Sequence, residues 1–131
     1  MHLHIITTGG SIDKHYSTAH SDFIVGEPQV ISILQNANPG IQVTIASLAA
    51  KDSLALTDSD RERIVRYIEK SSYTRFIITH GTDTMIQTAN ALKQTRDKVI
   101  ILTGAMKPAA FTNSDAAFNL GSAVIAAQIL E

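Results

Sequence analysis

The chain has 131 residues, no cysteine and a net charge of −1 at neutral pH, and 44% of its residues are hydrophobic. This length suits a single globular domain with a packed core, and no apolar run approaches the roughly 18 residues that a membrane span requires. The near-neutral charge gives no support for binding to nucleic acid or a membrane surface, and the lack of cysteine excludes disulfides and thiolate metal sites.

The first half of the chain predicts two strands around one helix. An apolar run over Leu3–Thr8 is expected to form a buried strand that ends at a pair of glycines, and residues 11–25 are expected to form an irregular polar loop. A helix is expected from about Glu27, because proline is tolerated in a first helical turn, to the stop signal at residues 36–40. The second strand is expected over residues 41–48.

The second half continues this alternation. Residues 57–70 predict a helix whose first turn carries capping side chains and acids, and residues 75–79 predict a short strand that is apolar on both faces. A helix over 83–94, a strand over 98–103 and a last helix over 115–130 complete the chain. The pattern predicts an α/β fold, a doubly wound (Rossmann-like) parallel sheet with helices on both faces.

In such sheets, ligands bind beyond the carboxyl ends of the strands. The residues expected there are small or polar, and three of the four groups contain a hydroxyl side chain. The groups are Thr7–Ser11, Ala50–Ser53, His80–Thr84 and Gly104–Lys107. This convergence predicts a binding site at the carboxyl edge of the sheet.

Two of these groups suggest chemistry. In TGGS, residues 8–11, two glycines permit unusual backbone angles and lift the hydroxyl of Ser11 from the strand end, although a tight turn without function is the alternative. His80–Thr84 joins a strand to a helix, so its amides can hold a carboxylate or an oxyanion. There Thr82 can orient a proton or a water and Asp83 can pair with an ammonium group, whereas helix capping, worth about 1 kcal/mol, is the alternative.

Four stretches of the sequence resemble, in order and spacing, the motifs of the L-asparaginase family. They are TTGGSID (7–13), HGTDTM (80–85), LTGAMKP (102–108) and SDAAFNL (114–120). The resemblance covers the whole chain but corresponds only to the larger, N-terminal domain of that family. It therefore implies one asparaginase N-terminal-like α/β domain over residues 1–131, with the C-terminal domain absent, as in a short or truncated member.

The resemblance also implies a role for each matching residue. Ser11 falls on the family's nucleophilic threonine, and Tyr16 on a loop tyrosine that hydrogen-bonds the nucleophile, with the chemically inert Phe23 as the competing candidate. Thr82 and Asp83 match the second catalytic threonine and the aspartate that holds the substrate α-amino group. The residues implied in substrate binding are Gly10, Asp52, Ser53, Gly81, Thr82, Asp83 and Ala105.

The implied reaction is hydrolysis of L-asparagine to L-aspartate and ammonia through the Ser11 hydroxyl, with no cofactor and no metal. The family's catalytic lysine has no counterpart here, so a non-catalytic amino-acid-binding domain is one alternative. A glutaminase-asparaginase is another, because one methylene contributes only about 1–3 kcal/mol of discrimination. An amidase that supplies ammonia to a larger assembly is the third.

The expected partner is a small molecule, asparagine or aspartate, without nucleic acid or membrane. The amino-terminal residues lack the basic and apolar regions of a secretory signal, which favours the cytoplasm. A homo-oligomer is expected, because an open sheet leaves an edge strand and helix faces uncovered, with the alanine- and isoleucine-rich last helix as a contact. His2 and His4 lack a third ligand and are expected to be structural rather than a metal pair.

Overall fold

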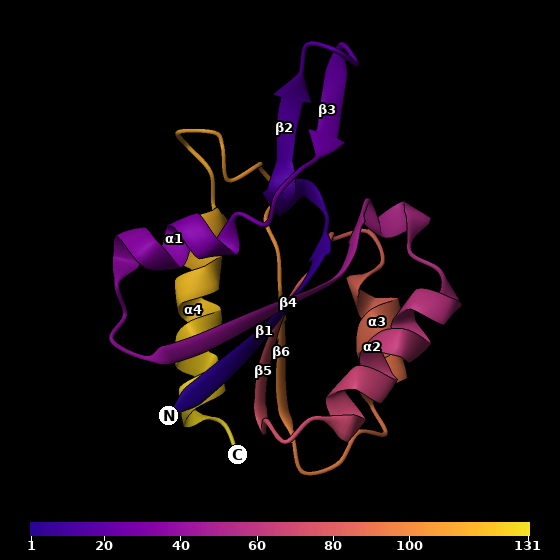
Figure 1. Ribbon diagram of the computed structural model, residues 1–131, viewed down its shortest axis with the longest axis vertical. Helices are drawn as coiled ribbons and strands as arrows, with labels where there is room; N and C mark the ends of the chain where they lie inside the picture. The colour runs from indigo at the N-terminus through magenta and orange to yellow at the C-terminus, as the bar shows by residue number, and fades with distance from the viewer.

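The computed structural model describes residues 1–131 as a four-stranded parallel sheet flanked by helices, with strand order β4-β1-β5-β6 (Figure 1). The sheet strands are β1 (His2–Gly9), β4 (Gln42–Lys51), β5 (Arg75–Thr79) and β6 (Val99–Thr103). The helices are α1 (Val30–Ala37), α2 (Asp58–Lys70), α3 (Met85–Leu92) and α4 (Ala116–Ile129). From β1 the chain passes to one neighbour, β4, and then crosses to the other, β5, so the predicted doubly wound sheet is confirmed.

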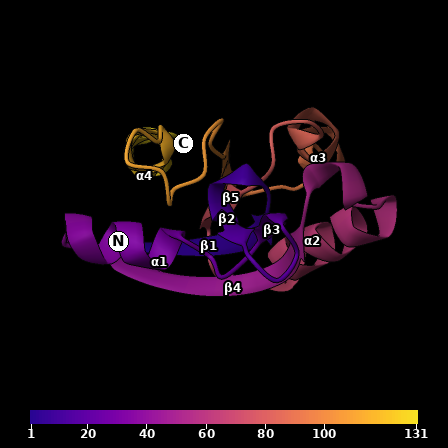
Figure 2. The ribbon, with the colours of Figure 1, turned by 90° about the horizontal axis from the view of Figure 1, so that it is seen from above.

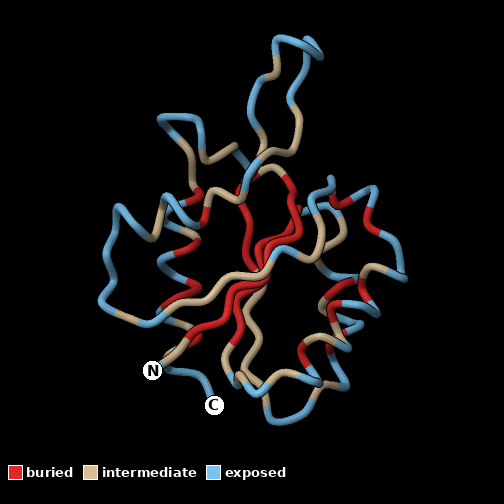
Figure 3. The backbone as a smooth tube through the Cα atoms, viewed as in Figure 1, coloured by how far each residue is buried: buried red, intermediate tan, exposed pale blue.

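One pair of helices covers each face of the sheet (Figure 2). On the face of α1 and α4, Leu3 and Ile5 of β1 pack with Val30. On the face of α2 and α3, Ile6 packs with Ile64. Successive residues of β1 therefore enter opposite cores, as the period of a strand requires. Figure 3 shows the burial concentrated in the central strands.

The ends of the helices follow local chemistry. α2 begins where its capping pattern predicts, because the Thr57 hydroxyl accepts the Asp60 N–H and the Asp60 carboxylate accepts the Thr57 N–H. α1 begins only at Val30, later than expected from the proline, and it ends at Ala37, where the C-cap residue Asn38 has a left-handed φ of 43°. None of the helices is both long and apolar enough to cross a membrane.

The prediction of an irregular loop over residues 11–25 is wrong. A 3-10 turn (Ser11–Asp13) leads into an antiparallel hairpin of β2 (Lys14–Ser17) and β3 (Asp22–Val25), which projects beyond the carboxyl edge of the main sheet (Figure 1). Both faces of this hairpin are largely exposed, so its sequence lacks the apolar alternation of a half-buried strand. Backbone pairing and cross-strand contacts form it instead.

Candidate active site

Glycine contacts join the loops that follow the central strands. Gly10 has a φ of 84°, and a Cβ on it would lie 2.4 Å from the Gly81 nitrogen, so only glycine permits this approach. The Gly10 N–H also donates to the Lys51 carbonyl at 3.0 Å. The loops after β1, β4 and β5 therefore touch at the point where the chain switches sides of β1. This is the predicted location of the site.

The hydroxyl and carboxylate candidates follow these two glycines directly. Ser11 is half-buried at the start of the 3-10 turn, and the Asp13 N–H closes that turn on the Gly10 carbonyl at 3.1 Å. Thr82 and Asp83 are exposed at the end of β5, just before α3. The Gly10–Gly81 contact thus brings together the backbones that carry Ser11 and Thr82, which are far apart in the sequence.

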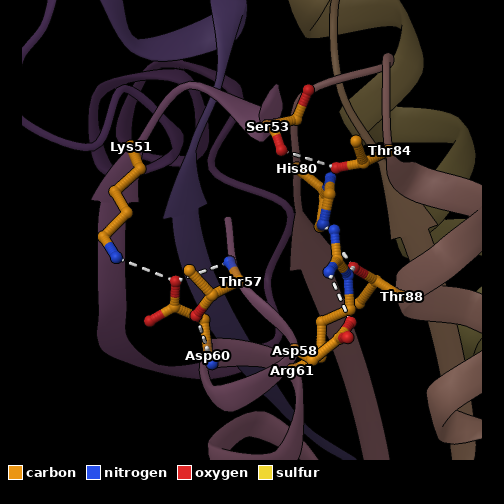
Figure 4. Close-up of polar contacts among 9 residues, drawn as sticks. All are labelled: Lys51, Ser53, Thr57, Asp58, Asp60, Arg61, His80, Thr84 and Thr88. Carbon is orange, nitrogen blue, oxygen red and sulfur yellow. Dashed lines mark hydrogen bonds and ion pairs between the residues drawn. The ribbon is translucent and has the colours of Figure 1, made fainter. Parts of the chain in front are cut away.

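Ser53 connects the end of β4 to the segment after β5. It is buried, its hydroxyl makes a long bond of 3.5 Å to the Asp83 carboxylate, and its carbonyl accepts the Thr84 hydroxyl at 2.7 Å (Figure 4). A Cβ on Gly81 would lie 2.7 Å from the Ser53 oxygen, which shows how closely the two segments pack. Thr84 is therefore engaged in structure, and Asp83 keeps an exposed carboxylate.

Asp52 forms an ion pair with the hairpin. Its carboxylate lies 2.8 Å from the Lys14 ammonium at the start of β2. The negative charge at this position therefore comes with a neighbouring cation, and the base of the hairpin is tied to the end of β4. The sequence motifs did not predict this ion pair between the hairpin and the end of β4.

The structure does not bring Tyr16 into a hydrogen bond with Ser11. Tyr16 and Phe23 are cross-strand partners on the hairpin, and both rings are exposed. Their ring centroids lie 5.5 Å apart in an edge-to-face arrangement, and Phe23 contacts Phe111 in the same way at 5.7 Å. The two competing candidates thus lie side by side and share one aromatic cluster.

The segment after β6 is held by the start of α4. The Asp115 carboxylate accepts the N–H groups of Met106 and Lys107, both at 3.0 Å, and Asn119 donates to the carbonyl that precedes Ala105 at 2.9 Å. The bonds from Met106 and then Lys107 lower the pKa of Asp115. The bonds of Asp115 and Asn119 thus fix the turn around the buried Ala105.

Asp13 is a buried carboxyl group that the sequence interpretation did not assign. It is 3% exposed, and one oxygen accepts the Gln29 N–H at 2.9 Å just before α1. Its carbonyl accepts the Gly26 N–H at 2.9 Å, so one residue ties the Ser11 turn to both the hairpin base and α1. Burial raises the pKa of Asp13 to about 6, although the Gln29 bond opposes this. Only its position two residues after Ser11 could have drawn attention to it.

The histidines have structural surroundings. Burial lowers the pKa of His80, and the ring hydrogen-bonds the Gly81 carbonyl. His2 and His4 both hydrogen-bond Thr44 and stack on Tyr73, at ring centroid distances of 4.7 and 4.5 Å. No group of three or more side chains of the metal-ligating types gathers in the structure.

The sequence matches the family model described as "Asparaginase, N-terminal" over residues 2–130. It is 35% identical to L-asparaginase 2 of Escherichia coli over 94% of this chain and 38% of that protein. It is 32% identical to the glutaminase-asparaginase of Acinetobacter glutaminasificans over 92% of this chain and 40% of that protein. The fold matches the thermostable L-asparaginase from Thermococcus kodakarensis with a TM-score of 0.83 and 30% identity, over 98% of this chain and 41% of that one. The chain thus spans about two-fifths of the length of these relatives.

Proposed function

The chain belongs to the asparaginase family, whose N-terminal domain it matches over residues 2–130, and from this membership we propose that it hydrolyses the side-chain amide of L-asparagine to L-aspartate and ammonia. The domain is proposed to be one unit over residues 1–131 that supplies the nucleophile-bearing part of the site. The observation that carries the proposal is the contact between Gly10 and Gly81, because it puts Ser11 and Thr82 on adjoining backbones at one edge of the sheet.

The chemistry begins at Ser11. Its Oγ attacks the side-chain amide carbon, the C–N bond breaks, and ammonia leaves with a proton from the attacking hydroxyl. Water then cleaves the ester, which regenerates the serine and releases aspartate. Backbone N–H groups near Gly10 and Thr82, other than the Gly10 N–H that donates to Lys51, are proposed to bind the oxyanion; one such donor is typically worth about 3–4 kcal/mol.

The substrate's charged groups need partners at the same edge. Asp83 is proposed to hold the α-ammonium group, since its carboxylate is exposed and only weakly bonded to Ser53 at 3.5 Å. The substrate carboxylate is proposed to lie near Ser53 and Asp52. The Lys14 ammonium, 2.8 Å from Asp52, supports that placement because it offsets the negative charge of this aspartate.

Ser11 needs a group that accepts its hydroxyl proton as it attacks. Lys51, the last residue of β4, is engaged with Asp60 at 2.8 Å (Figure 4). Tyr16 is proposed as the acceptor, in a position that the hairpin reaches by bending toward Ser11. Thr82, acting through its neighbours, is the alternative acceptor.

Ammonia release from L-asparagine by the purified chain tests the proposal. Ser11→Ala is expected to abolish turnover with little change in the melting temperature, because the half-buried hydroxyl lies at a strand end and outside the core. Ser59→Ala, an exposed serine of α2, is the matched control and should retain full activity. Turnover that survives Ser11→Ala would reject the nucleophile assignment.

A binding module without turnover is the competing function, favoured because the structure does not bring Tyr16 into a hydrogen bond with Ser11. Calorimetry with L-aspartate separates the two, because a binding module retains the amino-acid pocket but releases no ammonia. Asp83→Asn is expected to raise the aspartate dissociation constant by about tenfold or more if Asp83 holds the ammonium group. L-Glutamine in the same ammonia assay separates a glutaminase-asparaginase from a strict asparaginase.

We also propose that the protein is a cytoplasmic homo-oligomer that associates through α4. Phe118 and Ile129 of that helix have exposed fractions of 80% and 71%. Together with Ile125 of the same helix, they line an apolar hollow of about 760 Å³. An apolar surface of this kind typically marks an interface. Light scattering of Phe118→Ser is expected to give a smaller particle than the wild type, and cell fractionation tests the compartment.

A further inference from the structure

Arg61 is a buried cation whose position needs an explanation. It lies in the first turns of α2 and is 8% exposed, whereas most arginines of this helix point to solvent. Its carboxylate partner, Asp58, lies 3.1 Å away but has a side chain that is 97% exposed. A solvated partner compensates little for a buried charge. The other contact of Arg61 points inward, where its Nε–H donates to the Thr88 hydroxyl of α3 at 3.3 Å.

This contact is the first in a series of hydrogen bonds that runs from Arg61 through Thr88 to His80 (Figure 4). A carbonyl oxygen only accepts, so the His80 Nδ1, 2.6 Å from the Gly81 carbonyl, carries the proton of the neutral ring. The His80 Nε2 is then an acceptor and takes the Thr88 hydroxyl proton at 2.7 Å, while the Thr88 oxygen accepts from the Arg61 guanidinium at 3.3 Å. Burial, assisted by the charge of Arg61, lowers the pKa of His80 and keeps the ring neutral.

The chain ends on a peptide group of the candidate active site. The Gly81 carbonyl and the Thr82 N–H belong to one planar trans peptide and point in opposite directions. A bond that holds the Gly81 carbonyl toward His80 therefore turns the Thr82 N–H away from it. Gly81 is itself fixed between Gly10 and Ser53, so this peptide has little freedom to rotate.

We propose that Arg61 and Thr88 are positioning residues, which hold the His80 ring, with its proton on Nδ1, against the Gly81 carbonyl and thereby orient the Gly81–Thr82 peptide for the substrate. The role of this peptide toward substrate rests on the proposed function. The tautomer and the orientation of the Thr82 N–H are properties of the protein alone. Neither residue touches the substrate, and both act through His80 from helices that pack behind the site.

Nitrogen-15 NMR of the histidine side chains tests the proposal, with Thr88→Val as the main variant because valine keeps the shape and lacks the hydroxyl. Wild type and Thr88→Ser are expected to show the His80 proton on Nδ1. In Thr88→Val, Nε2 remains an acceptor but loses its donor, so the Nε2 signal should move and the Thr82 amide signal should shift as the ring loses its support. The aspartate dissociation constant should rise about fivefold or more in Thr88→Val and recover in Thr88→Ser.

Arg61→Met provides a second variant should Thr88→Val fail to fold. Without the Arg61 donor, the Thr88 hydroxyl is no longer held in place, so the same changes in the Nε2 and Thr82 amide signals are expected. Arg63→Met, the same change at an exposed arginine of α2, is the matched control and should leave the His80 signals unchanged.

The outcomes separate this inference from the proposed function. A wild-type protein that neither releases ammonia nor binds aspartate would reject the proposed function. The positioning role would still be supported if Thr88→Val or Arg61→Met changed the His80 Nε2 and Thr82 amide signals. An unchanged Nε2 signal in both variants, or unchanged Thr82 and aspartate binding despite a changed Nε2 signal, would overturn the inference.

Discussion

Replacement of Asp13 by asparagine is expected to stabilise the protein at neutral pH. Asp13 is 3% exposed, and burial raises its pKa from 3.8 to about 6. A carboxyl group whose pKa is higher in the folded state binds its proton more tightly there, so its ionisation lowers stability. The stability contributed by the protonated group is fully present below pH 3.8 and is lost as the pH rises through about 6. A difference of about 2 pH units corresponds to about 3 kcal/mol.

Urea unfolding of wild type and Asp13→Asn between pH 4 and pH 8 measures this effect. Asparagine keeps the oxygen that accepts the Gln29 N–H, so the free energies of unfolding should nearly agree at pH 4. At pH 7.5 the variant should be more stable by up to about 3 kcal/mol.

Asp22→Asn is the control for this titration, since Asp22 also accepts a backbone N–H bond, at 2.7 Å from Phe23, but is exposed. Its change in stability should be small beside that of Asp13→Asn. If Asp13→Asn is equally destabilised at both pH values, the reasoning is refuted, because the hydrogen bond to the carboxylate would then outweigh the cost of burying its charge.

Two further predictions concern the backbone of the site. Gly10→Ala should abolish aspartate binding, because its Cβ would meet Gly81 at 2.4 Å, whereas Gly121→Ala, with no atom within 4 Å, should stabilise α4 by about 1 kcal/mol in urea unfolding. Equal effects of the two substitutions would contradict the close approach. Asp115→Ala should speed hydrogen exchange of the Met106 amide, and unchanged exchange would argue against the clamp. Because its hydrogen bonds lower the pKa of Asp115, the wild-type protection should persist above pH 3.8 and decline as the pH falls through the lower folded-state value.

The sequence by itself determined the kind and order of the main elements. The strand predicted over residues 75–79 has those bounds in the structure, and the capping residues before α2 placed its start. These features depend on interactions between near neighbours, or on the period with which side chains are buried, and both are visible in a short window of sequence. The position of the candidate site followed from topology, because parallel strands bring their carboxyl ends to one edge.

Only the tertiary structure decided which side chains meet there. The hairpin after Ser11 was missed because its faces are exposed and its stability comes from pairing across the turn. Arg61 resembles any polar residue of α2 until α3 presents the Thr88 hydroxyl to it, and Asp13 resembles a loop acid until α1 covers it. Whether a polar side chain is buried depends on contacts with residues that are distant in the sequence. The local hydrophobic periodicity carries no information about those contacts.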